Sequence, residues 1–307
     1  MGFIGSKIIE QLEDQNEIIS FDLVSRDNPI LNSHPNVRVI EGNVLDLERL
    51  TQILTDGVNI VIHCAAITGI DTVIQKPIST IRVNLIGSAN VFEAAAKVNQ
   101  CERIISFSSS EVFGQHSLLS TENEKFSIGQ IGETRWAYSV SKLATEHLAM
   151  AYFKEHHLPV TILRPFNVYG PGQIGASAMR SFILRALNNE NLEIHGDGTQ
   201  IRAWCYIDDM VDATLLALED PKAVGESFNI GNQRAVVTIY GLANVVIRVL
   251  NSASKIVFTK KDYEDVELRI PAISKARELL GFEAKIELEE GIARTADYYR
   301  IHNKQPQ

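Results

Sequence analysis

The sequence predicts an α/β fold, in which a doubly wound parallel sheet is followed by a smaller C-terminal α/β domain. Two observations lead to this fold class. Over residues 1–110, short apolar runs alternate with segments whose apolar residues recur at helical spacing, and from about Gly170 glycine and proline cluster and the alternation ends. We therefore expect one domain over residues 1–169 and a second over residues 170–307, with part of about 203–245 packing back on the first.

Each element is predicted from the period of its apolar residues. Short apolar runs predict strands at Glu17–Phe21, Val37–Glu41, Ile60–His63, Arg103–Ser108, Val160–Arg164 and Phe228–Gly231. Apolar residues three and four positions apart predict helices at Ile4–Leu12, Leu47–Ile53, Ile81–Asn99 and Tyr138–His156. The polar stretch Gly114–Arg135 fits either a loop over a site or a tolerated surface insertion.

Composition and charge limit the classes of function. The 307 residues are 45% hydrophobic and 22% charged, and no apolar run approaches the roughly 18 residues that a membrane helix needs. The net charge is −9 and Lys and Arg form no long block, so we expect neither a nucleic-acid nor a membrane partner. Three dispersed cysteines without a CxxC pair, and the lack of a signal region, favour a reducing cytoplasm; no metal site is predicted.

The first residues form a glycine pattern typical of nucleotide binding. Gly2 and Gly5 stand at the start of a predicted helix, where glycine lets backbone N–H groups approach a pyrophosphate. Asp22 follows the next predicted strand, at about the position where a ribose 2′-hydroxyl binds in such folds. A carboxylate there would repel the 2′-phosphate of NADP, so the pattern favours NAD. The alternative is a glycine pair at a helix start and a surface aspartate.

A second pattern concerns proton transfer. Tyr138 and Lys142 stand four residues apart on one predicted helix face. A nearby ammonium stabilises a phenolate, so we expect the pKa of Tyr138 to be lowered and the phenol to accept a proton from a substrate hydroxyl. Ser109 follows the strand Arg103–Ser108, and ligands bind at the carboxyl ends of strands in such sheets. Without that context, the same spacing would more often mark an ordinary amphipathic helix.

Seven motifs along nearly the whole chain resemble those of the extended short-chain dehydrogenases, in the NAD-dependent nucleotide-sugar epimerase/dehydratase family, and most of all a UDP-glucose 4-epimerase. The motifs are GFIGS (Gly2–Ser6), VIHCAA (Val61–Ala66), SSSEVFG (Ser108–Gly114), YSVSK (Tyr138–Lys142), LRPFNVYGPG (Leu163–Gly172), GDGTQIRAW (Gly196–Trp204) and FNIGN (Phe228–Asn232). The resemblance implies a Rossmann-like NAD-binding domain followed by a nucleotide-sugar-binding domain.

The same resemblance implies roles for individual residues. Tyr138 is the expected base, Lys142 tunes it and binds the nicotinamide ribose, Ser109 hydrogen-bonds the reacting hydroxyl, and Glu111 completes the expected catalytic set. The residues expected to bind NAD are Gly2, Phe3, Ile4, Gly5, Asp22, Asn43, Val44, Ala65, Ala66, Asn84, Tyr138, Lys142 and Phe166. Those expected to bind the nucleotide-sugar are Ser110, Asn167, Arg202, Asp265 and Arg269.

Two features depart from the family pattern. Members begin with a strand followed by Gly-Gly-Ala-Gly-Phe-Ile-Gly, whereas this sequence starts at the final Gly-Phe-Ile-Gly and so resembles an N-terminally truncated member. Asn43 stands where an aspartate commonly contacts adenine. An amide can still hydrogen-bond that base, so we expect a small effect.

The pair Ser110-Glu111 bears on the reaction, because a dehydratase often has Asp-Glu there. We expect a 4-epimerase that oxidises the sugar C4 hydroxyl transiently to a 4-keto intermediate. A UDP-glucuronate-type decarboxylase, a 4,6-dehydratase and a non-enzymatic NAD or nucleotide-sugar binding module stay open. The most favoured substrate is a UDP-sugar, and a homodimer is expected through the helices Ile81–Asn99 and Tyr138–His156.

Overall fold

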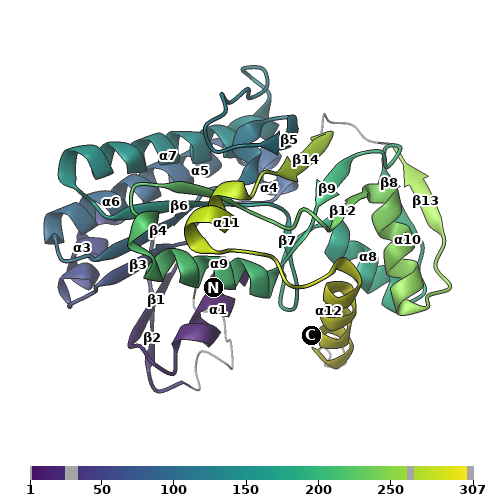
Figure 1. Cartoon of the computed structure of the whole chain (residues 1–307), viewed down its shortest axis with the longest axis horizontal. Helices are drawn as coiled ribbons and strands as arrows, with labels where there is room; N and C mark the ends of the chain where they lie inside the picture. The colour runs from purple at the N-terminus through teal and green to yellow at the C-terminus, as the bar shows by residue number, and fades with distance from the viewer. Residues whose placement is uncertain (1, 25–33, 261–265, 303–307) are drawn as a thin grey trace.

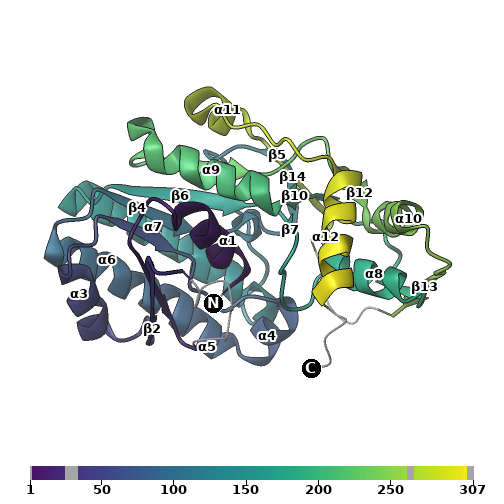
Figure 2. The ribbon, with the colours of Figure 1, turned by 90° about the horizontal axis from the view of Figure 1, so that it is seen from below.

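The computed structural model describes residues 2–24, 34–260 and 266–302. Its centre is a parallel sheet in the order β11-β6-β4-β3, which lies between two layers of helices (Figures 1 and 2). The strands are β3 (Ile60–His63), β4 (Arg103–Phe107), β6 (Val160–Pro165) and β11 (Ser227–Ile230). One layer contains α3 (Leu47–Thr55), α6 (Gly87–Val98) and α7 (Ala137–His156), and the other contains α1 (Phe3–Leu12), α9 (Ile207–Glu219) and α11 (Ser274–Leu280).

Side chains of neighbouring residues on the central strands alternate between the two layers. Ile104 and Ile162 pack with α6, while Ile105 and Leu163 pack with α9. All four are buried, which is why these strands consist of continuous apolar runs rather than alternating ones. The predicted α/β class is confirmed, and the predicted strands are present with ends within one residue of those expected.

The helix expected at Ile81–Asn99 is different in the structure. The segment starts earlier, with α5 (Pro77–Ile81), continues through the π-helical turn η1 (Arg82–Ile86) and only then becomes α6. Pro77 occupies the first helical position, where its missing N–H costs nothing, and the apolar period gave no sign of that start. The wider π turn contains Asn84, whose side chain is fully buried.

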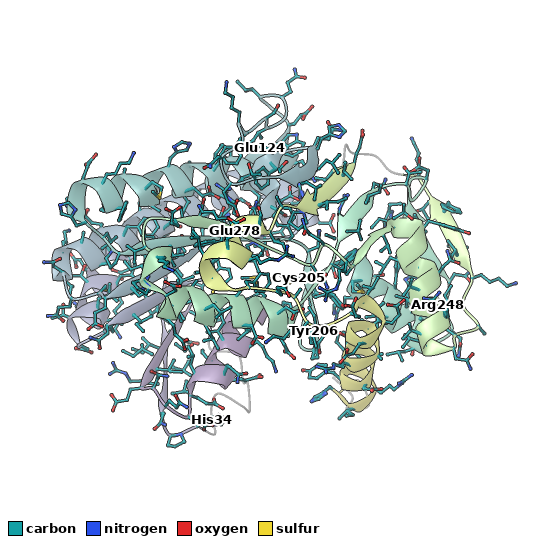
Figure 3. The ribbon with its side chains drawn as sticks, in the orientation of Figure 1. His34, Glu124, Cys205, Tyr206, Arg248 and Glu278 are labelled. Atoms are coloured by element: carbon teal, nitrogen blue, oxygen red, sulfur yellow. The ribbon has the colours of Figure 1, made fainter. Side chains whose placement is uncertain are left out.

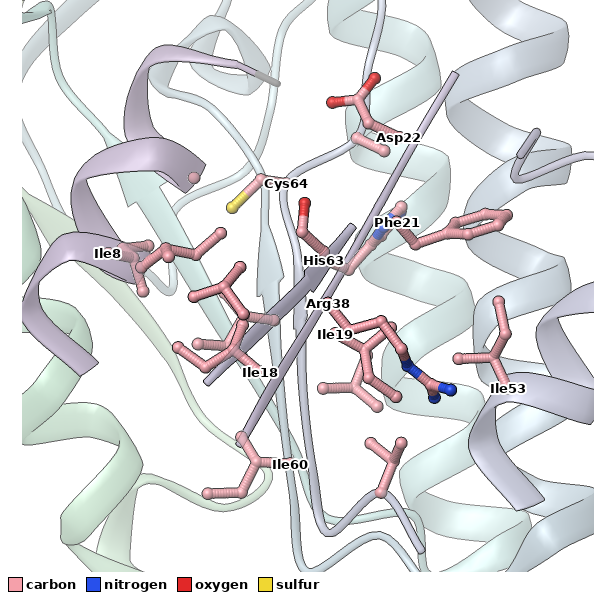
Figure 4. A pocket seen from close by; sticks show the side chains of 18 of the residues that line it. Ile8, Ile18, Ile19, Phe21, Asp22, Arg38, Ile53, Ile60, His63 and Cys64 are labelled. Carbon is pink, nitrogen blue, oxygen red and sulfur yellow. The ribbon is translucent and has the colours of Figure 1, made fainter. Parts of the chain in front are cut away.

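The doubly wound sheet is interrupted. β1 (Ile18–Asp22) pairs only with β2 (Val37–Glu41), and no described strand hydrogen-bonds to both β1 and β3. The residues of β1 and β3 instead line a cavity of about 1460 Å³, into which Ile18 and Ile60 project (Figure 4). Ile60 is 46% exposed as a result, although it belongs to a strand of the central sheet.

The C-terminal part has its own apolar core, to which α10 and α12 contribute. Its mixed sheet has the order β12-β9-β14-β5, and β13 pairs with β8. Cys205 and Tyr206 form β10 between the two parts of the molecule (Figure 3). The remaining elements are α4 (Ile70–Gln75), η2 (Ser110–Phe113), β5 (His116–Ser120), η3 (Thr134–Trp136), β7 (Val168–Tyr169), α8 (Ala178–Leu187), β8 (Leu192–His195), β9 (Ile201–Ala203), β10 (Cys205–Tyr206), η4 (Pro221–Ala223), β12 (Val236–Thr238), α10 (Ile239–Leu250), β13 (Ile256–Thr259), β14 (Leu268–Pro271) and α12 (Leu288–His302).

The stretch Gly114–Arg135, predicted to be a loop, contains the strand β5. It pairs in parallel with β14, which lies about 150 residues further along the chain. A polar run is a poor strand former by itself, but the free edge of β14 supplies the backbone hydrogen bonds. No helix within the described ranges is long and apolar enough to cross a membrane.

Shortening a buried side chain of the central sheet should lower the free energy of unfolding more than shortening one that borders the cavity. Ile105→Ala, at a fully buried site in β4, should lower the free energy of unfolding by about 2–5 kcal/mol. Ile60→Ala, its control on the neighbouring strand, should cost roughly 0.5 kcal/mol because Ile60 borders the cavity. Urea unfolding followed by circular dichroism measures both, and equal costs would contradict this description of the core.

Candidate active site

The candidate catalytic residues meet where β4 ends and α7 begins. β4 ends at Phe107, and Ser109 is the last residue before the turn η2. Tyr138 and Lys142 lie in the first two turns of α7. The Lys142 ammonium donates a hydrogen bond to the Phe107 carbonyl at 2.7 Å, and the Ser109 hydroxyl is hydrogen-bonded to the Tyr138 phenol. The structure therefore brings Ser109, Tyr138 and Lys142 together.

The protonation of this group differs from the sequence-based expectation. Burial raises the pKa of Tyr138 to about 12; the hydrogen bond from Ser109 and the charge of Arg269 act against it, and Glu111 adds to it. Burial also lowers the pKa of Lys142 to about 8. The expected lowering of the Tyr138 pKa is thus wrong for this structure: the cost of burying a phenolate outweighs the hydrogen bond from Ser109 and the charge of Arg269, and Lys142 is not among the groups that shift this pKa.

Glu111 lies between two arginine side chains. Its carboxylate accepts a hydrogen bond from Arg135 at 3.0 Å and pairs through its other oxygen with Arg269. Burial raises the pKa of Glu111, but the two guanidinium charges outweigh burial and hold that pKa below its usual value. Both arginines are buried, and Arg269 Nε has no hydrogen-bond partner among the described residues.

The pairing of β5 with β14 brings Arg269 to Glu111. The register places Arg269 opposite Ser117, next to the end of η2. Arg269 Nη2 also donates to the Gly114 carbonyl at 2.6 Å. Gly114 has φ +75°, and a Cβ there would lie 1.8 Å from the carbonyl oxygen of Ser127, so only glycine fits.

The cavity between β1 and β3 fits the predicted cofactor. Gly2 precedes α1 with its backbone extended, so the N–H groups of the first turn face the cavity rim, and Asp22 stands at the carboxyl end of β1 (Figure 4). The expected NAD-binding residues that line the cavity are Gly2, Gly5, Asp22, Asn43, Val44, Ala65 and Ala66. A helix start and a strand-end carboxylate at the rim suit a dinucleotide, whereas the space between the strands is lined by apolar side chains such as Ile18, Ile19 and Ile60.

The other expected NAD-binding residues are not among the residues that line this cavity. Phe3 and Ile4 pack against the apolar core of the C-terminal part, and Phe166 is buried against Phe113. Asn84 is buried, and its amide bonds both backbone groups of Ile67. Asn84 therefore fixes the turn after β3, and residues of that turn line the cavity.

Four of the expected nucleotide-sugar residues fall within the described part of the chain; Asp265 lies outside it. Arg202 on β9 and Arg269 on β14 are direct neighbours in a parallel pairing, and both are buried. Arg202 donates hydrogen bonds to the carbonyls of Ile201 and Val266, so both arginines are held in fixed positions. Asn167 has the left-handed φ of +41° and donates to the Ala203 carbonyl at 2.8 Å, and Ser110 is buried in η2.

Two further buried groups lie close to the catalytic residues. Glu146 and Arg164 form an ion pair at 2.6 Å, which the sequence analysis missed; its one signal was the spacing of Glu146, four residues after Lys142. His63 is a packed strand residue: burial lowers its pKa to about 3, and its ring lies 2.8 Å from the Ser88 hydroxyl.

Within the residues that the structure describes, no group of three His, Cys, Asp or Glu could hold a metal ion.

The sequence is similar to known proteins along most of its length. A model of the NAD dependent epimerase/dehydratase family matches residues 1–231. The chain is 31% identical to a UDP-N-acetyl-alpha-D-glucosaminuronate decarboxylase of Bacillus cytotoxicus, over 97% of this chain and 95% of that protein. It is 32% identical to UDP-glucuronic acid decarboxylase 5 of Arabidopsis thaliana, over 98% and 87% of the two chains.

Solved structures agree with this. The UDP-glucose 4-epimerase of Thermotoga maritima has a TM-score of 0.88 and 30% identity, covering 98% of this chain and 96% of that one. The UDP-glucuronic acid 4-epimerase of Bacillus cereus, solved with UDP-glucuronic acid and NAD, has a TM-score of 0.87 and 28% identity, with the same coverage. The resemblance, the fold class and NAD as cofactor are therefore confirmed. The chain is an enzyme of the NAD-dependent epimerase/dehydratase family.

Proposed function

We propose that this enzyme decarboxylates a UDP-uronic acid through a 4-keto intermediate. The sequence analysis put 4-epimerisation first and decarboxylation second. Two curated relatives that the chain matches over nearly its whole length are uronate decarboxylases, which favours the reverse order. The observation that carries the proposal is the cluster of Arg135, Arg269 and Glu111 beside Tyr138.

This cluster suits a sugar whose C6 is a carboxylate. Glu111 holds the two guanidinium groups together, and Arg269 Nε is a buried donor that still lacks a partner among the described residues. A buried unpaired donor is costly, so a ligand that accepts its hydrogen bond gains affinity.

The chemistry divides into an oxidation and a carbon–carbon cleavage. NAD, when bound, accepts the C4 hydride and later returns it. Tyr138, aided by Ser109, takes the O4 proton as a phenolate, a state that the positive charge of a bound nicotinamide would favour against the burial that raises its pKa here; loss of the O4 proton and the C4 hydride leaves a ketone β to the C6 carboxylate. The C5–C6 bond then breaks: CO₂ leaves, and the electron pair forms an enolate whose oxygen accepts hydrogen bonds from Ser109 and Tyr138. C5 takes a proton in place of CO₂, and Glu111 holds both guanidinium groups toward the leaving carboxylate.

Arg202 suits the diphosphate of the nucleotide. Its planar fork of donors matches phosphate oxygens. Asn167, on the strand connection next to β9, adds an amide.

The second candidate is the 4-epimerase that the sequence analysis favoured. Its support is the similarity to two 4-epimerases, one named for UDP-glucose and one for UDP-glucuronic acid. Both reactions share the oxidation at C4 and differ in the fate of the 4-keto sugar. An epimerase returns hydride to the opposite face and leaves the C5–C6 bond intact, so Glu111 would have little to do in the second half of its reaction.

Tyr138→Phe tests the first half-reaction. The change removes the proton acceptor and keeps the ring, so turnover should fall by about 10²-fold or more while the nucleotide-sugar still binds. NADH absorbance and product NMR give the rate, and calorimetry gives the affinity. Tyr152→Phe, at a tyrosine of the same helix bonded to Glu93, is the matched control and should keep its activity. Turnover of Tyr138→Phe within about threefold of wild type would rule out this role.

Glu111→Gln separates the two candidates. For a decarboxylase, CO₂ release should drop on the order of 10²-fold or more because the two guanidinium groups lose their counter-ion, while oxidation at C4 continues and NADH accumulates. Glu133→Gln is the control, since Glu133 lies two residues before Arg135, directly before η3, and accepts its bond from the Trp136 indole. If Glu111→Gln keeps most of its activity and the product retains C6, the result supports the 4-epimerase over the decarboxylase.

We further infer a homodimer that buries the outer face of α5, η1 and α7, three elements that contact one another. Ile78, Ile86 and Val140 are 81%, 46% and 46% exposed on this face. Ile78→Glu should therefore give a monomer by light scattering at micromolar concentration. Ile301→Glu, at an exposed isoleucine of α12, should leave the dimer intact. A wild-type monomer would contradict the inference.

A further inference from the structure

Behind the catalytic lysine lies a buried polar cluster that the proposed chemistry does not use. Glu146 accepts two hydrogen bonds from Arg164, at 2.9 Å from Nε and 2.6 Å from Nη2, and one more from the Ser108 hydroxyl. All three residues are buried. An ion pair removed from water is costly, and replacing it with apolar residues is often neutral for folding, so stability alone does not account for the cluster.

The position of the cluster connects it to the site. Tyr138, Lys142 and Glu146 follow one another at intervals of four residues, so they share one face of α7. Ser108 follows β4 directly and is covalently next to Ser109, and Arg164 lies on β6. The cluster therefore fixes the catalytic face of α7 to the carboxyl ends of the two central strands.

We propose that Glu146, held in place by Arg164, is a positioning residue that keeps Lys142 protonated beside Tyr138. The inference rests on the proposed roles of Tyr138 and Lys142. Glu146 touches neither the phenol nor the reacting atoms. It acts through the charge that it presents to the ammonium one helical turn away, and through the anchorage of that turn.

The other groups around Lys142 cannot supply this charge. From β3 and the turn after it, His63 and Cys64 face the ammonium; burial lowers the pKa of His63 to about 3 and raises that of Cys64 to about 12, so both are neutral near pH 7. From β4 only the Phe107 carbonyl reaches it. Burial lowers the pKa of Lys142 to about 8, and Cys64 and Glu146 oppose this effect; because the pKa of Cys64 is about 12, its thiol is uncharged where Lys142 titrates, which leaves the carboxylate of Glu146.

Arg164 also connects the pair to a second buried carboxylate, which provides a control. Its Nη1 donates to the Glu122 carbonyl at 3.3 Å, and the Glu122 carboxylate accepts from the Asn229 backbone N–H at 2.8 Å. Glu122 is buried like Glu146, but its carboxylate is not among the charges that act on Lys142. Both glutamates are therefore buried and hydrogen-bonded to Arg164, and they differ in their effect on the Lys142 ammonium.

The test is the titration of Lys142 itself, followed by NMR of the full chain labelled with ¹³C-lysine, with Lys142→Met identifying the signal. Glu146→Gln should lower the pKa of Lys142 by about one pH unit, because the ammonium loses its counter-charge. The alkaline limb of kcat/KM should move the same way, with KM for the nucleotide-sugar little changed. Glu122→Gln should leave the pKa of Lys142 where it is.

If Glu146→Gln does not fold, the double variant Glu146→Gln/Arg164→Met leaves no charge of the pair buried alone, and the same fall in the pKa of Lys142 is expected. An unchanged Lys142 pKa in the folded variant, or an equal fall in Glu122→Gln, overturns the proposal. Tyr138→Phe in the same assay distinguishes failure of the proposed function from failure of this inference. If Tyr138→Phe stays active, the proposed function fails. If Tyr138→Phe is inactive and the pKa of Lys142 does not change in Glu146→Gln, only the role of Glu146 is refuted.

Discussion

The ion pair between Glu111 and Arg269 joins the two parts of the molecule at the point where the chemistry is proposed. Glu111 belongs to the turn after the central strand β4, and Arg269 comes from β14, more than 150 residues later. Because the partners are buried, neither can be left alone without a large cost, so the mixed sheet is held in register against the parallel sheet. Arg202 and the Gly114 carbonyl take their places from the same register.

Charge is distributed unevenly around the reacting centre. Arg135 and Arg269 both pair with the carboxylate of Glu111, and Arg202 lies next to Arg269 on the neighbouring strand. Glu146 follows Lys142 by one helical turn on α7, pairs with Arg164, and is one of the charges that raise the pKa of Lys142. These groups are buried, so water screens their interactions only weakly. Burial is also the largest effect on the pKa of Tyr138, larger than that of any one neighbouring residue.

The sequence could predict the parts of the fold that local pattern determines. The central strands and α7 follow from apolar runs and helical spacing, and the catalytic trio of Ser109, Tyr138 and Lys142 follows from motif order. It could not predict β5, whose polar residues form a strand only because β14 offers an edge, nor the π turn around Asn84. The clusters of Glu111 and Glu146 depend on such long-range pairings, so spacing along the sequence could not identify their partners.

The central claim is that the carbon–carbon bond to C6 breaks, and one isotope experiment addresses it. The enzyme is incubated with NAD and UDP-glucuronic acid carrying ¹³C at C6, with UDP-N-acetylglucosaminuronic acid labelled in the same way as a second substrate, and the label is followed by NMR. The account predicts that with at least one of them the label appears as bicarbonate while a UDP-linked pentose forms. Retention of the label in a hexuronic acid inverted at C4, with no labelled bicarbonate from either substrate, would contradict it.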